Sequence, residues 1–409
     1  MAHKSSISKR YDVLIIGSLP AYLGAKQHSG LGNVVWGLAK ELKKQPISFA
    51  IAAKGKYYER YKKVNGIEIY GLGASFICFL LTTYKVLFNF REVLAIKLLK
   101  DKLRLIYAVY FLIYIARKVD FDLIHLNHVT NQFPLAVRLL NIKVPVIAHI
   151  HSYSTLVNCK SDDKLRLLQK NINYQLSKVN YVIHVSKSVR KQGLEFGIKW
   201  TTDEKVVYNG IKYDLQKLKE LECPTEKGLI CFAGAFLPIK GVDILLKSLQ
   251  TIKNRINKIV WIGEGPLRGE IENVCRRLDI KYEMTGMIPN EEVIKWLSRS
   301  QLLVVPSLSE SFGQVYIESL LAGTPAIGYY KVLEEFNEAF SLDKTGDKYL
   351  IPFNTKSENE HELSEKIIMS LTQKVKFDDE LRNKILSKTY WPSIIENYVD
   401  IYKRLLGNS

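Results

Sequence analysis

Short apolar runs of strand length alternate with stretches of helical pattern along the chain, and this alternation limits the folds that it can adopt. Apolar residues fill each run instead of alternating with polar ones, as in a strand buried on both faces. Such strands belong to parallel sheets that helices cover on both sides, so we predict an α/β protein with doubly wound sheets. The runs are VLIIG (13–17), SFAIAA (48–53), LIHL (123–126), PVIAHI (145–150), VIHVS (182–186), KVVYN (205–209), LICFAGAF (229–236), KIVWIGEG (258–265), YEMTG (282–286), QLLVVPS (301–307) and PAIGYY (325–330), and the expected helices include 32–44, 241–254, 266–278, 290–300 and 313–322.

The length of 409 residues suits two domains of about 200 residues each. A polar, charge-rich segment, KYDLQKLKELECPTEKG (212–228), follows the last strand of the first half and predicts the boundary between them. We expect a first domain over 1–211, a linker over 212–228 and a second domain over 229–387. Doubly wound domains bind ligands at the carboxyl ends of their strands, so functional residues are expected there.

The positive charge of the chain is concentrated in its first half. The formal net charge is +18, and residues 1–210 alone carry 32 Lys/Arg against 13 Asp/Glu. The remaining residues are nearly neutral, with 27 Lys/Arg against 28 Asp/Glu. Such an excess indicates an anionic partner, namely membrane headgroups, nucleic acid or a phosphorylated acceptor. Because the sequence contains no recognisable nucleic-acid-binding module, no nucleic-acid partner is expected.

Residues 76–118 combine long apolar stretches with eight Lys/Arg side chains, which only Glu92 and Asp101 oppose. Apolar residues at helical spacing between cations are typical of a helix that lies in a membrane interface. Two amphipathic core helices with solvated lysines are the alternative, and the pattern alone leaves both open. No stretch of 18 uncharged apolar residues exists, so no membrane-spanning helix is predicted.

The cysteines and the N-terminal residues indicate where in the cell the protein lies, and the cysteines indicate a reducing compartment. Five scattered cysteines form neither a CxxC pair nor a disulfide framework, and no zinc site is expected. The first apolar run, VLIIG, is typical of a buried strand and not of a signal peptide. We expect a cytoplasmic protein that associates peripherally with the inner face of the cell membrane.

The segment 301–323 predicts a strand, a polar turn and a helix that begins near Gly313. Backbone amides at such a helix start, with a glycine that permits close approach, suit a diphosphate or the oxygens of a sugar. Glu310 lies at the turn, and Glu318 lies about two helical turns later on the same face. Each carboxylate could accept hydrogen bonds from vicinal hydroxyls, one pair on a hexose and one on a ribose. A solvated acid at a helix start plus a surface glutamate is the alternative.

The sequence ESFGQVYIESLLAGTP (310–325) resembles the donor-binding signature of family 4 glycosyltransferases, which have the GT-B fold. The resemblance implies two Rossmann-like domains that face a central cleft, with C-terminal helices over 388–409 crossing back to the first domain. It also implies a retaining transfer from a UDP- or GDP-linked sugar, which is a substrate, so neither a cofactor nor a metal is expected. Further family blocks follow in order at 29–42, 121–128, 145–152, 185–190, 206–211, 232–249 and 261–272.

The resemblance assigns roles to individual residues. Glu310 would contact the donor sugar, Lys240 would neutralise the departing diphosphate, and His151 would lie near the reacting centre as the third candidate catalytic residue. His151 could instead be a satisfied strand-end histidine, because His149 and His125 crowd the same region. The donor-binding candidates are Gly30 and Gly32 on the first glycine-rich loop, and Ser311, Phe312, Gly313 and Glu318 at the turn and helix described above.

The chain departs from the family pattern in its phosphate clamp. Ala235 stands where the family usually has an arginine, and Arg268 is a candidate to replace that charge. Our first hypothesis is hexosyl transfer to a saccharide or lipid-linked saccharide acceptor in surface polysaccharide synthesis. The departure keeps a second hypothesis open, a non-catalytic GT-B partner that stabilises or recruits a glycosyltransferase at an anionic membrane surface.

Two other motifs point to different chemistry. Asp120-Phe121-Asp122 spells the DxD of metal-dependent transferases, but it lies at the start of a strand, where the family carries a structural acid. GEGPLRG (263–269) resembles a dinucleotide fingerprint with one residue too many, and a tight turn before a helix is sufficient to explain it. A nicotinamide oxidoreductase is the third hypothesis, and it rests only on the glycines of 263–269.

Overall fold

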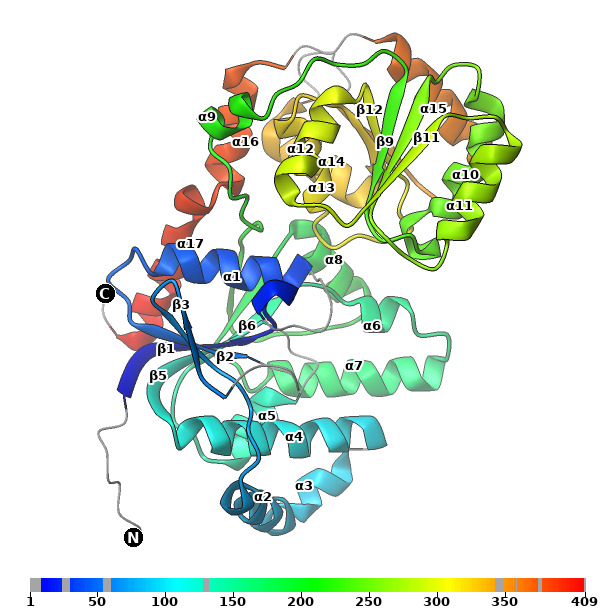
Figure 1. Cartoon of the computed structure of the whole chain (residues 1–409). Helices are drawn as coiled ribbons and strands as arrows, with labels where there is room; N and C mark the ends of the chain where they lie inside the picture. Colours follow the sequence, from blue (N-terminus) through cyan, green and yellow to red (C-terminus); the bar gives the residue numbers. More distant parts are fainter. Residues whose placement is uncertain are drawn as a thin grey trace. The chain divides into compact units, whose positions relative to one another are not determined.

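The chain divides into two compact domains, Met1–Gly210 with Trp391–Ser409, and Ile211–Tyr390. The chain passes from the first domain to the second between Gly210 and Ile211, at the beginning of the charge-rich segment 212–228. Part of this segment forms the short helix α9 (Leu215–Glu220) in the second domain. Figure 1 labels the helices and strands of both domains. The computed structural model describes residues 9–23, 30–53, 60–96, 98–127, 132–342, 349–355, 357, 359–373 and 377–407.

The first domain is built on an eight-stranded sheet with the order β3-β4-β2-β1-β5-β6-β7-β8. Its neighbouring strands are parallel, except that β3 and β4 form an antiparallel pair at one edge. In Figure 1, α1 lies on one side of this sheet, and α4, α5 and α7 lie on the other. The strands are β1 (Lys9–Gly17), β2 (Phe49–Ala53), β3 (Lys62–Val64), β4 (Ile67–Tyr70), β5 (Val119–Leu126), β6 (Val146–Ile150), β7 (Tyr181–His184) and β8 (Asp203–Val206). The helices are η1 (Ala21–Leu23), α1 (Gly30–Leu42), α2 (Phe76–Phe88), α3 (Phe90–Ala95), α4 (Leu99–Ala116), α5 (Phe133–Leu139), α6 (Ser154–Val157), α7 (Asp162–Leu176), α8 (Lys187–Glu195) and α17 (Trp391–Leu406).

The second domain is built on a six-stranded parallel sheet with the order β11-β10-β9-β12-β13-β14. Its strands are β9 (Leu229–Ala233), β10 (Lys258–Ile262), β11 (Tyr282–Gly286), β12 (Leu302–Val305), β13 (Ala326–Tyr329) and β14 (Leu350–Phe353). Besides α9, its helices are η3 (Pro238–Lys240), α10 (Val242–Ile252), α11 (Arg268–Arg277), α12 (Asn290–Arg299), α13 (Gln314–Leu321), α14 (Tyr330–Phe340), α15 (Glu360–Thr372) and α16 (Asp379–Thr389).

These sheets confirm the predicted doubly wound α/β architecture, and each apolar run identified in the sequence overlaps a strand. Three strands, β3, β4 and β14, were absent from the prediction. β3 (KKV) carries two lysines and β14 (LIPF) contains a proline, residue types that occur rarely in central strands. Both strands lie at sheet edges, where such residues are tolerated.

Each sheet reverses its strand order next to its first strand. β1 lies between β2 and β5, and β9 lies between β10 and β12. Doubly wound sheets bind ligands at the carboxyl ends of the strands beside such a switch point. The loops that follow β1, β5, β9 and β12 are therefore the places where functional side chains are expected.

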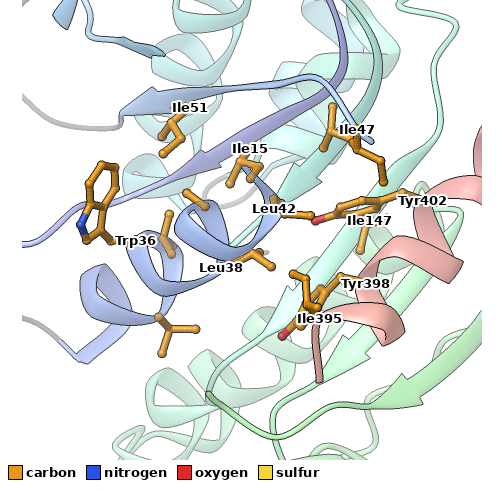
Figure 2. Close-up of a cluster of buried hydrophobic side chains, with 14 of the residues drawn as sticks. Ile15, Trp36, Leu38, Leu42, Ile47, Ile51, Ile147, Ile395, Tyr398 and Tyr402 are labelled. Atoms are coloured by element: carbon orange, nitrogen blue, oxygen red, sulfur yellow. The ribbon is translucent and has the colours of Figure 1, made fainter. Parts of the chain in front are cut away.

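The last helix of the chain completes the core of the first domain. α17 packs against α1, and its inward side chains are buried. Figure 2 shows Tyr398 and Tyr402 of this helix among Leu38 and Leu42 of α1 and Ile147 of β6. Because aromatic side chains of this size each bury roughly 150–250 Å², the first domain depends on the end of the chain for much of its core.

Two glycines make room for the indole ring of Trp391. A Cβ atom at Gly37 of α1 would lie 2.3 Å from Trp391 Nε1, and one at Gly210 would lie 2.1 Å from Trp391 Cδ2. Neither position accepts a larger residue unless the ring moves, because both distances are far below van der Waals contact. α17 is thereby fixed against α1 and against the segment that follows β8.

Gly37→Ala is expected to destabilise the first domain by about 1–3 kcal/mol, because the added methyl group overpacks the buried ring. Alanine is otherwise the better helix former by about 1 kcal/mol, so a loss of stability would come from the ring contact. Gly269→Ala is the control, since nothing lies within 4 Å of the corresponding Cβ position in α11. Urea unfolding measures both variants, and a Gly37→Ala protein as stable as the wild type would contradict the packing.

Candidate functional site

The second domain brings two loops together at the carboxyl ends of β9 and β12. Gly241 has a φ of 70°, and a Cβ atom there would lie 2.0 Å from the carbonyl oxygen of Pro306, so glycine is needed for this close approach. The amide of Leu308 donates a hydrogen bond to the carbonyl of Ile239 over 2.9 Å. These contacts fix η3 against the turn that precedes α13.

Lys240 and Glu310 meet across these loops. The Lys240 ammonium forms an ion pair with Glu310 Oε1, and Ser307 Oγ donates to the same oxygen over 3.2 Å. Both side chains are largely shielded, with 26% of Lys240 and 11% of Glu310 exposed. The structure thus joins the lysine and the carboxylate that the sequence singled out, although 70 positions separate them along the chain.

The helix α13 begins at the turn where the sequence predicts a helix start. Its N-cap is Gly313, whose φ of 67° lies in the left-handed region, and a Cβ atom there would lie 2.4 Å from the Tyr316 ring. Phe312 is buried and packs edge-on against Phe336, with 5.3 Å between the ring centroids. The side chain of Phe312 therefore anchors the turn in the core. Ser311 is half-buried beside it.

Glu318 is buried, which contradicts the alternative that it is a surface glutamate. It is 6% exposed, and its Oε1 accepts hydrogen bonds from Asn290 Nδ2 of α12 (2.9 Å) and from Gln314 Nε2 (3.2 Å). Burial raises the pKa of Glu318 to about 7, and the hydrogen bonds from the two amides offset part of that effect. The carboxyl group therefore titrates near neutral pH.

Glycines in the turn after β10 pack against the loop after β9. A Cβ atom at Gly263 would lie 2.0 Å from the carbonyl oxygen of Gly234, and one at Gly265 would lie 2.6 Å from the carbonyl oxygen of Phe236. This packing accounts for Gly263 and Gly265, the first two glycines of GEGPLRG (263–269), as parts of a tight turn, whereas Gly269 lies in α11. It removes the main support for a dinucleotide fingerprint at this position.

Arg268 forms ion pairs with two glutamates. Its guanidinium pairs with Glu264 Oε1 at 2.6 Å and with Glu272 Oε1 at 3.2 Å. Ala235 is exposed in the loop after β9. Of the two cations expected in the phosphate clamp, the structure therefore places Lys240 at these loops and gives no support to Arg268 as a replacement for the other.

In the first domain, His151 directly follows β6 and faces Asn127, the first residue after β5. His151 Nε2 lies 3.3 Å from Asn127 Oδ1, and its half-buried ring lies 4.1 Å from the His149 ring between centroids. Asn127 is 1% exposed and follows a strand of the β1–β5 switch point. His151 thus occupies the carboxyl edge of the sheet, where doubly wound domains carry their functional residues.

Two further histidines extend from His151 into the core. His125 Nε2 lies 3.3 Å from His149 Nδ1, and His125 Nδ1 lies 2.6 Å from the hydroxyl of Tyr402 in α17. Burial lowers the pKa of His125 to about 3 and that of His149 well below its ordinary value. Both rings are therefore neutral at pH 7, and they support His151 without adding charge.

Gly30 and Gly32 lie in the first turn of α1, and not on the loop where the resemblance places them. A Cβ atom at Gly32 would lie 2.6 Å from the carbonyl oxygen of Leu19, so this glycine serves the packing of the loop after β1. Nothing lies within 4 Å of a Cβ position at Gly30, which is exposed. Gly30 is therefore the more accessible of the two to a ligand.

The acids of the DxD sequence lie in β5, away from its carboxyl end. The guanidinium of Arg10 binds Asp122 with two hydrogen bonds, 2.5 Å from Nη2 to Oδ1 and 2.9 Å from Nε to Oδ2. This pair links β1 to β5 and supports a structural role for Asp122. Within the described ranges, no three His, Cys, Asp or Glu side chains cluster in a way that could hold a metal ion.

A large apolar surface covers α2, α3 and the start of α4, and we call it the α2–α4 apolar surface. α2 turns the small residues Cys78 and Thr82 toward the domain and its large apolar side chains outward. Among the large hydrophobic side chains elsewhere in the part of the chain that the structure describes, only Tyr22 and Met287 are as exposed as the eight most exposed residues of this surface. These eight, each at least 59% exposed, are Phe76, Phe79, Tyr84, Leu87, Phe88, Leu94, Leu99 and Leu103.

The core-helix interpretation of residues 76–118 fits only part of the segment. α4 buries most of its side chains from Leu105 to Ile115, as expected of a core helix. α2 and α3 keep apolar side chains exposed, and Figure 1 shows them beside α4 at the edge of the first domain. Among the described helices, none has the length and apolar character needed to cross a bilayer.

Asn290 and Asn127 contact candidate residues of the site but lie outside the motifs found in the sequence. Asn290 lies in a predicted helix, and nothing in the sequence connects it with Glu318, 28 positions later. Asn127 does have a signal, since it is a polar residue directly after an apolar strand, as His151 is. Ser307, in contrast, lies within the segment 301–323 that the sequence already singled out.

Two family models match the chain, one in each domain. Residues 28–215 match the model described as Glycosyltransferase Family 4, and residues 227–373 match the model described as Glycosyl transferases group 1. An uncharacterized glycosyltransferase of Methanocaldococcus jannaschii is 31% identical over 208 residues, which are 50% of this chain and 55% of that protein. The chain spans little more than half the length of the curated relatives that it matches.

Solved structures share the fold of the whole chain. Sucrose-phosphate synthase from Thermosynechococcus elongatus matches with a TM-score of 0.71 at 16% identity, covering 98% of this chain and 100% of that one. HepE from Anabaena, solved with UDP and glucose, matches with a TM-score of 0.62 at 15% identity, covering 96% and 99%. At these identities the similarity shows the fold alone, and it confirms the predicted GT-B class with two Rossmann-like domains.

Glu318 is expected to make the protein less stable as the pH rises from about 5 to about 7.5. Its folded-state pKa of about 7 exceeds the ordinary value of 4.5, so in this window the native protein retains a proton that the unfolded chain releases. The stabilisation is fully present below about pH 4.5 and is lost as the pH rises through the folded pKa.

Glu318→Gln keeps the shape of the side chain but cannot ionise, and it should reduce this decline by about 1–3 kcal/mol. Urea unfolding of both proteins at the two ends of the pH window measures the effect. Equal declines in the wild type and the variant would show that Glu318 does not titrate as its burial predicts.

Proposed function

We propose that this chain, whose two domains both match glycosyltransferase family models, is a retaining transferase that moves a hexose from a nucleotide-diphosphate donor to a saccharide or lipid-linked saccharide of a surface polysaccharide. The observation that carries the proposal is the Lys240–Glu310 ion pair at the carboxyl ends of β9 and β12. It joins a cation, which a diphosphate requires, to a carboxylate, which can bind sugar hydroxyls. The start of α13 adds backbone amides beside them.

In this proposal the ion pair changes partners when the donor binds. Glu310 neutralises Lys240 in the structure described here. A diphosphate carries more negative charge than a carboxylate, so it would attract the ammonium of Lys240 and release Glu310 to bind the sugar. Glu318, once ionised, would accept hydrogen bonds from the ribose. The complex of HepE with UDP and glucose supports a UDP-linked sugar as the donor.

The transfer itself would take place on one face of the sugar. The bond from the anomeric carbon to the diphosphate oxygen breaks, a bond to the acceptor oxygen forms on the same face, and the acceptor's hydroxyl proton passes to the departing diphosphate. Lys240 would stabilise the negative charge that develops on this leaving group, so we propose a reaction that needs no metal. His151, whose Nε2 contacts Asn127, is the residue of the first domain that we propose to lie near the reacting centre.

The surface of the first domain supports an acceptor at an anionic membrane. Exposing a large apolar side chain forgoes roughly 1.5–3 kcal/mol relative to burying it, and the α2–α4 apolar surface leaves eight of them at least 59% exposed in one segment. Lys85, Arg91 and Lys100 belong to the same helices. A membrane interface would cover the apolar side chains while the cations contact phosphate groups, so we propose peripheral attachment to the inner face of the cell membrane.

A non-catalytic partner of a transferase remains the second candidate. Ala235 provides no charge, and Arg268 is paired with Glu264 and Glu272, so the clamp holds one cation fewer than expected. An enzyme would release UDP or GDP from a sugar donor, slowly even without an acceptor, whereas a partner protein would release neither.

Glu310→Gln and Lys240→Met are each expected to reduce sugar transfer by about 100–1,000-fold, because each removes a charge that acts at the reacting centre. Nucleotide release from a panel of sugar donors, measured with and without acceptor, gives the rates. Lys258→Met is the matched control, since it removes a lysine from a similar pair with Glu283 (2.5 Å) at the start of β10. Full turnover in both site variants would refute the site.

Replacing Phe79 and Leu87 together by serine is expected to weaken binding to vesicles that contain phosphatidylglycerol by about 10-fold or more. Both side chains project from the exposed side of α2. Pelleting assays measure the bound fraction, and binding by the wild type should fall as salt is raised.

The control for this experiment replaces Leu194 and Met369 by serine. These side chains are 48% and 50% exposed and lie outside the α2–α4 apolar surface. If they weaken vesicle binding as much as the α2 pair does, or if the wild type does not bind anionic vesicles at low salt, the attachment is wrong.

A further inference from the structure

We propose that a pocket under the α2–α4 apolar surface binds one hydrocarbon chain of an anionic phospholipid whose headgroup carries hydroxyls. The proposal rests on the membrane attachment in the proposed function and adds a specific lipid site to it. The pocket has a volume of about 460 Å³ and is lined by residues of α3, α4 and α7 and of the α3–α4 connection. This volume lies within the range of roughly 300–1,000 Å³ that is usual for small-molecule sites.

The walls of the pocket suit a hydrocarbon chain. Ile96 and Leu98, between α3 and α4, form one side, and Leu167 and Tyr174 of α7 form another. Apolar walls favour an apolar ligand because removing both apolar surfaces from water lowers the free energy. The chain would reach the pocket from the surface itself, since the exposed Leu99 directly follows Leu98.

The polar groups at the base of the pocket are already satisfied by one another. Asp101 is 2% exposed, and its carboxylate accepts hydrogen bonds from Arg104 Nη1 (2.9 Å) and from Asn171 Nδ2 (2.8 Å). Asn171 Oδ1 in turn accepts from Gln132 Nε2 over 3.0 Å. A ligand that enters this far therefore meets few unsatisfied polar groups, which favours a chain over a sugar or a nucleotide.

The remaining polar lining residues define the headgroup. Arg91 and Lys170 are exposed and would bind a phosphate. Glu92 Oε2 is buried and has no hydrogen-bond partner among the described residues. A buried carboxylate oxygen favours a ligand that donates a hydrogen bond, such as a headgroup hydroxyl. Two cations and one acceptor together fit the phosphate and glycerol hydroxyls of a lipid such as phosphatidylglycerol.

The test uses the full chain and dihexanoyl phosphatidylglycerol below its critical micelle concentration, so that neither vesicles nor a sugar donor is involved. Isothermal titration should show saturable binding with one lipid per chain. Dihexanoyl phosphatidylcholine, which has no net charge and no headgroup hydroxyl, should bind about 10-fold more weakly, and glycerol phosphate, which has no chain, should not bind. Equal binding of the two lipids would overturn the headgroup assignment, and no saturable binding would overturn the site.

Leu167→Trp fills the pocket and should weaken lipid binding at least about 10-fold, while Leu194→Trp, on α8, should leave it unchanged. Lys170→Glu, at an exposed position, should weaken binding without affecting the folded core, so it keeps the test valid if the tryptophan variant unfolds. Unchanged lipid binding in Lys170→Glu and in folded Leu167→Trp would refute the proposal. Because nucleotide release and vesicle pelleting are measured separately, a failure of this site would be distinct from a failure of the transferase function.

Discussion

The first domain depends on one packing interaction, in which the last helix of the chain fills the space between α1 and the sheet. Trp391 enters this space beside Gly37 and Gly210, two positions where a Cβ atom would collide with its ring. Farther along α17, the hydroxyl of Tyr402 meets His125, and the histidines lead from there to His151 at the carboxyl edge. The core and the candidate histidine of the first domain are therefore supported by the same helix.

The second domain is consequently an insertion, because the chain leaves the first domain after Gly210 and returns at Trp391. The two ends of the insertion are paired. The amide of Ile211 donates to the carbonyl of Thr389 over 2.6 Å, and Ile211 forms a parallel bridge with Tyr390. The inserted domain thus begins and ends at one place, and it carries its own switch point, at which Lys240 and Glu310 meet.

Buried strands and the turn before α13 could be predicted because their signals are local: apolar runs, a glycine and a motif of contiguous residues. The partners of Glu318 could not, since Asn290 is polar, lies on another helix and has no pattern that points to a carboxylate 28 positions away. The outward direction of α2 was also not determined by its sequence. An apolar helix usually turns its large side chains inward, and here the small Cys78 and Thr82 face the domain instead. Tertiary packing determines both the partners of Glu318 and the face of α2 that is buried, and a local sequence pattern does not encode that packing.

The insertion also has a consequence for biosynthesis. A ribosome completes residues 1–210 first, but the helix that closes their core follows only after the 180 residues of Ile211–Tyr390. At translation rates of about 5–20 residues per second, the nascent first domain waits roughly 10–40 s for α17. During that time the sides of α1, β5 and β6 that α17 later covers stay open to chaperones, on the same domain whose α2 helix already exposes phenylalanine and leucine. Premature termination just before Trp391 would therefore yield an aggregation-prone fragment, even though such a fragment contains the described strands of both sheets.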